Sequence, residues 1–198
     1  MSGRSTIELK ADQLGLELDG QVLGEIVETL KQLEYAGYHF EAADASLELL
    51  MRAASGWTQD FFELEAFSVN VGHRSGSGSR AWNEVAVDVE TEATVKVHVS
   101  GERVVAIGEG NGPVNALDSA LRKALDGRHP QLERLHLTDF KVRVLETRQG
   151  TGAVTRVLID TTNGERTWTT IGVSENIIEA SWQALVDSMI YGLLHTPA

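Results

Sequence analysis

Cysteine is absent from this chain of 198 residues, which excludes disulfide bridges and thiol catalysis. Basic residues are scarce as well, since 17 Lys and Arg stand against 29 Asp and Glu and give a formal net charge of −12. A chain this acidic repels a phosphate backbone, so no nucleic-acid partner is expected. The lack of cysteine fits a cytoplasmic protein.

Long apolar runs are also missing. No segment approaches the roughly 20 apolar residues of a membrane-spanning helix, and residues 1–6 lack the charged-then-apolar pattern of a signal peptide. Hydrophobic residues nevertheless make up 42% of the chain, which suffices for ordinary cores. We therefore expect a water-soluble globular chain of one or two domains with no membrane partner.

The residue patterns of catalytic and metal centres do not occur. The histidines show neither His-x-His nor His-Glu-x-x-His spacing, so no metal site is expected. The carboxylates Asp139, Asp160 and Glu165 fall at strand ends or turns, where acidic residues are common without acid–base chemistry. We predict no catalytic residue, no metal and no cofactor, and we do not expect this chain alone to be an enzyme.

What the sequence does contain is an internal repeat. A glycine loop that opens a helix occurs at residues 108–113 and again, 64 positions later, at residues 172–177. Upstream of these loops, Phe67–Val71 corresponds to Phe140–Val144. The following helices match at positions that a helix buries: Ala116 with Ala180, Ala120 with Ala184, Leu121 with Leu185, Val114 with Ile178 and Leu125 with Met189. Spacing, turn chemistry and apolar face agree, which argues against chance similarity.

Each copy of the repeat is predicted to fold as β-β-β-α. Val95, Val97 and Val99 alternate with polar residues, as in a strand with one buried face. We expect an α+β fold of two pseudo-symmetric βββα units, 65–127 and 138–195, within a domain of residues 65–198.

A small helical module, residues 1–56, precedes this domain. Apolar residues at helical spacing between Leu23 and Leu33 predict one helix that stops at Gly37, and those between Ala43 and Ala54 predict a second that ends at Gly56. Two such helices bury too little surface alone, so we expect the module to pack on another part of the chain. Residues 57–64 are predicted to be a connector.

The first helix opening has the chemistry of an anion site. In Asn111-Gly112-Pro113 the proline takes the first helical position, and the bare amides and helix dipole can meet a carboxylate, such as that of an amino acid. Gly112 is expected to allow close backbone approach and a positive φ. From composition alone, the simpler interpretation is favoured: the glycines only turn the chain from strand to helix.

The stretch Gly108–Leu121 resembles the Gly-Asn-Gly-Pro helix opening of the regulatory (LeuA dimer) domain in 2-isopropylmalate and citramalate synthases. Asp139–Leu145, Gly150–Ala153 and Gly172–Trp182 extend the resemblance, and Gly37–Leu50 resembles the citramalate synthase-like branch. The doubled βββα pattern agrees with that family's fold. The resemblance covers nearly the whole chain.

The resemblance implies a site for an end-product amino acid, isoleucine or leucine, at a homodimer interface. It assigns Gly110, Asn111, Gly112, Val114 and Asn115 to the helix opening that contacts the ligand. Gly150, Gly152 and Ala153 match the loop and strand start that face it. Backbone and polar groups of the first set would hold the ligand's amino and carboxylate ends, while Val114 and Ala153 would touch its aliphatic side chain. The citramalate-like motifs favour isoleucine.

The resemblance implies an allosteric regulatory and dimerisation domain that mediates feedback inhibition in branched-chain amino acid biosynthesis. Family members begin with a catalytic barrel that binds a divalent metal and condenses an acyl-CoA with a 2-oxo acid, and no segment here corresponds to it. The expected partners are the amino acid, a second copy of the chain, and a catalytic barrel on the same or a separate chain. The alternative is a free-standing branched-chain amino-acid-binding regulator or dimerisation scaffold that acts on a separate partner.

Overall fold

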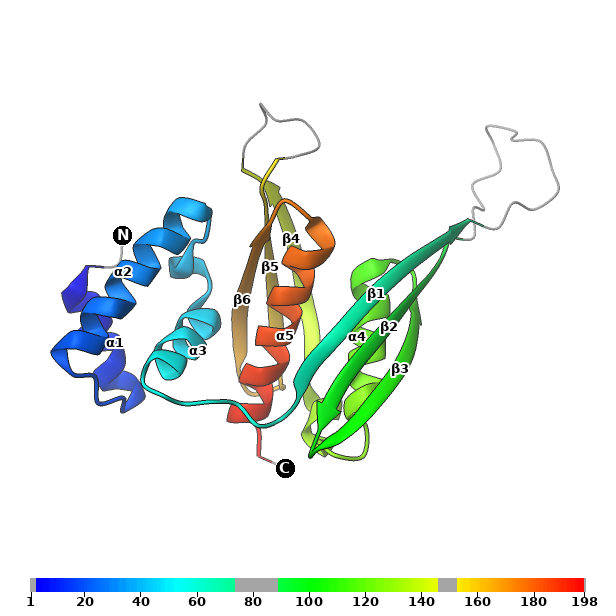
Figure 1. Cartoon of the computed structure of the whole chain (residues 1–198), viewed down its shortest axis with the longest axis horizontal. Helices are drawn as coiled ribbons and strands as arrows, with labels where there is room; N and C mark the ends of the chain where they lie inside the picture. The colour runs from blue at the N-terminus through cyan, green and yellow to red at the C-terminus, as the bar shows by residue number, and fades with distance from the viewer. Residues whose placement is uncertain (1–2, 74–88, 146–152, 198) are drawn as a thin grey trace. The chain divides into compact units, whose positions relative to one another are not determined.

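The computed structural model of the protein describes residues 3–73, 89–145 and 153–197. The chain divides into two compact units. The continuous unit is Asp60–Pro130, and the split unit combines Met1–Gln59 with Gln131–Ala198. Figure 1 shows the elements of both. Two short 3-10 helices, η1 (Phe40–Ala42) and η2 (Pro130–Arg134), join longer elements.

The continuous unit is one βββα motif. Strands β1 (Glu63–His73), β2 (Val89–Val99) and β3 (Glu102–Gly110) form an antiparallel sheet in that order, and helix α4 (Pro113–Leu125) packs on β2 and β3. Val95, Val97 and Val99 are fully buried, as their alternation predicted. A two-residue turn at Ser100 and Gly101, both with positive φ, joins β2 to β3.

The split unit contains the second βββα motif. Strands β4 (His136–Val144), β5 (Thr155–Thr162) and β6 (Thr167–Ser174) form a second antiparallel sheet, and helix α5 (Ile177–His195) packs on β5 and β6. The predicted α+β class with two βββα units is therefore confirmed.

Two details show that the motifs are copies at the backbone level. The β1–β2 register shifts between Leu64 and Ala66, and the β4–β5 register shifts between Leu137 and Asp139, at the corresponding place. Gly108 and Gly172 each lie under the following helix, where an added Cβ would collide with backbone atoms of that helix. These glycines let helix and sheet approach closely, which explains why both repeats keep one there.

The helical module packs on β6 and, through its last helix, on α5. Its helices are α1 (Arg4–Leu14), α2 (Gly20–Ala36) and α3 (Asp44–Ala54). Their apolar side chains form one core with Ile171 of β6, which is 1% exposed. The module therefore packs on another part of the chain, as expected.

The helices of the module end at glycines, as predicted. Gly37 ends α2 with a φ of 114°, and Gly56 follows α3 with a φ of 89°. Helix α1 was not predicted. The boundaries proposed at residues 56 and 65 stay a prediction.

Helix α3 also covers the free edge of β6. Three alternate amides of that edge donate to side chains: Thr169 to Asp44 at 3.4 Å, Ile171 to Ser46 at 3.1 Å and Val173 to Gln183 at 3.2 Å. These side chains satisfy donors that an edge strand would otherwise present to another chain. They fix Ser46 and Asp44 of α3 against the sheet.

Candidate functional site

The predicted residues of the first helix opening lie together in one tight turn of the continuous unit. Gly110 ends β3, Asn111 and Gly112 form the turn, and Val114 and Asn115 belong to the first turn of α4. The amide of Asn111 donates to the Asn115 side-chain oxygen at 3.3 Å, which closes the turn. A Cβ on Gly110 would lie 2.6 Å from the Ala116 nitrogen, so only glycine fits there.

The two helix openings differ in how their amides are satisfied. In α5, Asn176 is the N-cap, and its side chain accepts from the Ile178 amide at 2.9 Å. In α4 the repeat-equivalent position is Gly112, which has no side chain to cap the helix. Pro113 has no amide hydrogen, and the amides of Val114 and Asn115 receive no side-chain cap. The α4 opening therefore keeps N–H groups that can donate hydrogen bonds, together with the positive end of the helix dipole. Both favour the binding of an anionic group.

A buried hydroxyl next to this opening has no partner. Thr91 of β2 lies directly opposite Gly110 in the register, and it is fully buried. Among the described residues, its Oγ1 atom forms no hydrogen bond. Buried hydroxyls without a partner are uncommon and costly, because the group has lost its water without gaining a hydrogen bond. Sequence reasoning missed Thr91, although counting the alternation back from Val95 would have placed it on the helix-facing side.

The expected positive φ at Gly112 is wrong. Its φ and ψ are −179° and 170°, which is extended backbone. The following Pro113 explains this, because the proline ring pushes the preceding residue toward extended conformations. A Cβ at Gly112 would meet no atom within 4 Å. The fold therefore tolerates a side chain there, which makes the position a clean probe of ligand contact.

The second group of predicted residues is described only in part. Gly150 and Gly152 lie outside the described residues. Ala153 precedes β5 in the split unit and is 5% exposed, and the carbonyl of its neighbour Val154 accepts from the Leu145 amide at 2.8 Å. Whether these residues face a ligand remains a prediction.

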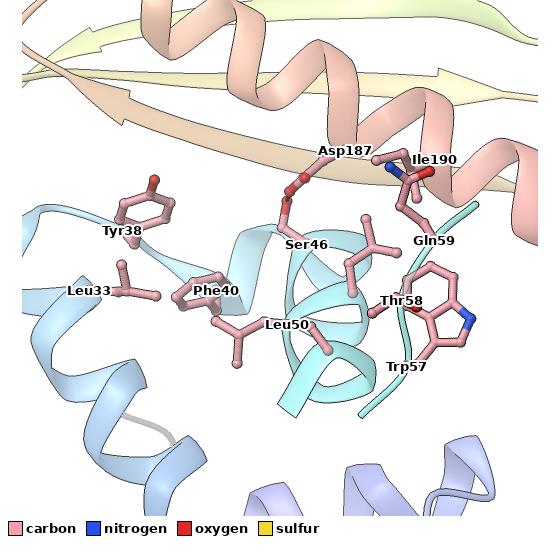
Figure 2. A pocket seen from close by; sticks show the side chains of 12 residues that line it. Leu33, Tyr38, Phe40, Ser46, Leu50, Trp57, Thr58, Gln59, Asp187 and Ile190 are labelled. Atoms are coloured by element: carbon pink, nitrogen blue, oxygen red, sulfur yellow. Dashed lines mark hydrogen bonds between the residues drawn. The ribbon is translucent and has the colours of Figure 1, made fainter. Parts of the chain in front are cut away.

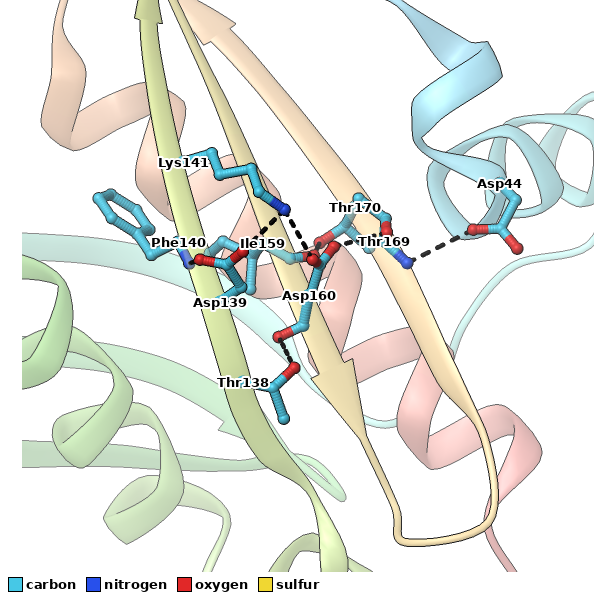
Figure 3. A network of polar contacts seen from close by, with 9 residues as sticks. All are labelled: Asp44, Thr138, Asp139, Phe140, Lys141, Ile159, Asp160, Thr169 and Thr170. Carbon is cyan, nitrogen blue, oxygen red and sulfur yellow. Dashed lines mark hydrogen bonds and ion pairs between the residues drawn. The ribbon is translucent and has the colours of Figure 1, made fainter.

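The carboxylates on β4 and β5 belong to a satisfied surface network (Figure 3). The Lys141 ammonium donates to Asp139 at 2.7 Å and to Asp160 at 3.0 Å, and the Thr169 hydroxyl donates to Asp160 at 2.6 Å. The hydrogen bond from Lys141 lowers the pKa of Asp139, assisted by the Phe140 amide. Paired in this way, the two carboxylates have a structural role, and the lowered pKa of Asp139 does not suit a general base.

Over the described ranges, no group of three His, Asp or Glu side chains could hold a metal ion. Within the same ranges, no helix has the length and apolar content needed to cross a membrane.

Comparison with known proteins decides the family. The model of the LeuA allosteric (dimerisation) domain matches residues 41–193, most of the chain. The protein belongs to the LeuA allosteric (dimerisation) domain family. The match spans α3 and both βββα motifs, with the uncapped α4 opening inside it.

The relatives of this LeuA domain include longer synthases. It is 51% identical over 197 residues to an (R)-citramalate synthase of Streptomyces coelicolor, covering 98% of this chain and 35% of that protein. It is 43% identical to an (R)-citramalate synthase of Aquifex aeolicus, and the match covers 98% of this chain and 35% of that protein. It is 30% identical to a 2-isopropylmalate synthase of the same organism, with 95% of this chain and 32% of that protein covered. The chain thus spans about a third of the length of these curated relatives.

Proposed function

We propose that this LeuA domain is the amino-acid-binding regulatory and dimerisation part of an acyl-CoA-dependent 2-oxo acid condensing enzyme, an (R)-citramalate or 2-isopropylmalate synthase. Its effector is isoleucine or leucine, which inhibits a catalytic barrel on the same or a separate chain in the cytoplasm. The family match, together with the names of the relatives, supports the parent activity. The single observation that supports a ligand site is the uncapped α4 opening.

The α4 opening supports a specific mode of binding. The ligand carboxylate would accept from the amides of Val114 and Asn115, where the helix dipole favours negative charge. The half-buried side chain of Val114 would meet the aliphatic part of the ligand. The family resemblance adds Gly150, Gly152 and Ala153 to the proposed ligand-binding residues.

Binding of the effector is expected to raise the melting temperature. A ligand at about 100 times its dissociation constant stabilises a one-site protein by about 2.7 kcal/mol, and 1 kcal/mol shifts Tm by about 2–4 °C for a chain of this size. Differential scanning fluorimetry with increasing isoleucine or leucine measures the shift. A free-standing regulator would give the same result, so this experiment tests the ligand site and not the parent enzyme.

The Gly112→Val variant should abolish that Tm shift while the protein remains folded. A valine side chain at the α4 opening would hinder a ligand there, and its Cβ would have no atom of the fold within 4 Å. Gly3→Val is the matched control, because Gly3 also has open space around its Cβ and lacks a positive φ. The ligand site is refuted if the Gly112→Val protein responds to the amino acid as the wild type does.

A homodimer is expected in solution. Helix α5 packs on β5 and β6, and the helix-facing residues of β4 retain exposed apolar side chains, with Phe140 40%, Val142 41% and Val144 50% exposed. Such contiguous apolar surface marks an interaction site, and the contact between two copies would be isologous. Sedimentation equilibrium should give about twice the chain mass of 21.6 kDa. A monomer at micromolar concentration, with and without amino acid, would rule out the dimer.

A further inference from the structure

A cavity of about 520 Å³ lies in the split unit, between α3, α5, the segment Trp57–Gln59 and the chain from the end of α2 to η1. Figure 2 shows its lining side chains. Most are apolar: Leu33, Phe40, Leu49, Leu50, Ala53, Trp57 and Ile190. Small-molecule sites are typically clefts of roughly 300–1,000 Å³ with an apolar wall and a few polar groups. The cavity fits that description.

The charged group in this wall is Asp187 of α5. Its side chain is partly exposed to the cavity and otherwise surrounded by protein. The Ser46 hydroxyl of α3 donates to its Oδ2 atom at 2.6 Å, and Figure 2 shows the two side chains pointing toward one another. The Ser46 hydroxyl also accepts a hydrogen bond from the Ile171 amide at 3.1 Å, and this bond holds the hydroxyl in place. The Oδ1 atom of Asp187 receives no hydrogen bond from any described residue.

No cation of the described structure pairs with Asp187. The basic side chains of α3 and α5 are engaged elsewhere: Arg52 lies 2.7 Å and His195 lies 2.8 Å from the carboxylate of Glu48. Among the described residues that line the cavity, none is Lys or Arg. Asp187 is therefore a negative charge at an apolar wall without a counter-ion.

The position of this carboxyl costs the folded state stability at neutral pH. Burial raises the pKa of Asp187 to about 6, against the opposing hydrogen bond from Ser46. Between about pH 4 and 6 the folded chain thus holds a proton that the unfolded chain releases, and stability falls as pH rises through that window. A destabilising charge in a cavity is characteristic of functional sites.

We propose that this cavity binds a small organic ammonium ion, whose hydrocarbon body contacts the apolar wall and whose N–H groups donate to Asp187. The ammonium would supply the missing counter-ion, and the aromatic ring of Trp57 adds a surface that attracts cations. A free amino acid does not suit the cavity, because no basic side chain there would neutralise its carboxylate. The site is therefore distinct from the one proposed for isoleucine or leucine, and either can fail without the other.

Calorimetric titration of the full chain at pH 7.5 tests the proposal. The probe is 2-phenylethylamine, with the neutral 2-phenylethanol and the anionic 3-phenylpropanoate as matched controls of similar shape. The amine should bind at least tenfold more tightly than either control. Absence of heat with millimolar amine, or equal binding of the alcohol, would overturn the proposal.

Two variants locate the binding. Asp187→Asn keeps an oxygen for Ser46 but removes the charge, and it should weaken amine binding at least tenfold. Glu28→Gln removes an exposed charge on α2 and should leave binding unchanged. Ala53→Phe should also abolish binding by filling the cavity, which keeps the test decisive if Asp187→Asn does not fold. Unchanged affinity in either cavity variant would contradict the assignment.

Affinity for the amine should also fall below pH 6, as Asp187 gains its proton while the amine stays charged. The other titratable groups on the surrounding elements are Lys31, Glu34 and Tyr35 near the end of α2, Tyr38, His39 and Glu41 around η1, Asp44, Glu48 and Arg52 on α3, and Glu179, Tyr191 and His195 on α5. Without ligand, Asp187→Asn should raise Tm at pH 8 and leave it unchanged at pH 3. A fall in affinity that persists in Asp187→Asn would assign the pH dependence to another group and overturn the role of Asp187.

Discussion

Replacing Gly172 with valine is expected to prevent the chain from folding. A Cβ at Gly172 would overlap the carbonyl oxygen of Ala180 and lie 2.8 Å from its carbon, so backbone atoms of α5 would have to move. Displacing this helix opens the core beneath it, where Leu185 and Met189 are fully buried. We expect a loss of more than about 4 kcal/mol, the range of exceptional single substitutions.

Urea unfolding followed by circular dichroism measures this loss. Gly112→Val is the matched control, because it adds the same side chain at a glycine with open space around its Cβ. Its stability should lie within about 1 kcal/mol of the wild type, the usual size of a change at a helix N-cap. If valine unfolds the chain outright, Gly172→Ala gives a smaller effect in the same direction. Stability of Gly172→Ala equal to that of the wild type would disprove the close helix–sheet contact.

The second large effect is expected at Ile171, where the helical module meets the sheet. Ile171 is 1% exposed and belongs to the core formed with α1–α3. Replacing it with alanine should cost about 2–5 kcal/mol, as for other large-to-small changes in a core. The measurement is again urea unfolding.

The repeat provides an internal control for Ile171. Ile107 occupies the equivalent position in β3, 64 residues earlier, but it is 50% exposed. Ile107→Ala should therefore change stability by less than about 0.5 kcal/mol. Equal losses for the two variants would show that burial by the helical module does not explain the effect at Ile171.

The sequence allowed the repeat to be predicted because local patterns carry it. The valines of β2 alternate strictly, and the glycine–helix openings recur at constant spacing. The positive φ assigned to Gly112 was wrong because the steric effect of Pro113 on its neighbour was not considered. Helix α1 was missed, although Ile7, Ala11 and Leu14 have helical spacing and Gly15 ends the helix with a φ of 66°.

The candidate sites show where sequence reasoning stops. The α4 opening is contiguous in sequence, so its residues could be named in advance. Thr91 joins that opening only through the register of β2 with β3. The cavity at Asp187 brings together α3 and α5, whose paired residues Ser46 and Asp187 are 141 positions apart. No local pattern encodes such a contact, because it depends on how the helical module packs against the second βββα motif.

Calorimetric titration of the folded dimer with L-isoleucine and L-leucine tests the regulatory assignment most directly, with D-isoleucine as the control ligand. We expect saturable binding of at least one of the two L-amino acids at about one site per chain. This binding should be retained in Gly3→Val and lost in Gly112→Val. Absence of heat with every branched-chain amino acid would contradict the assignment and leave a dimerisation domain without an effector site.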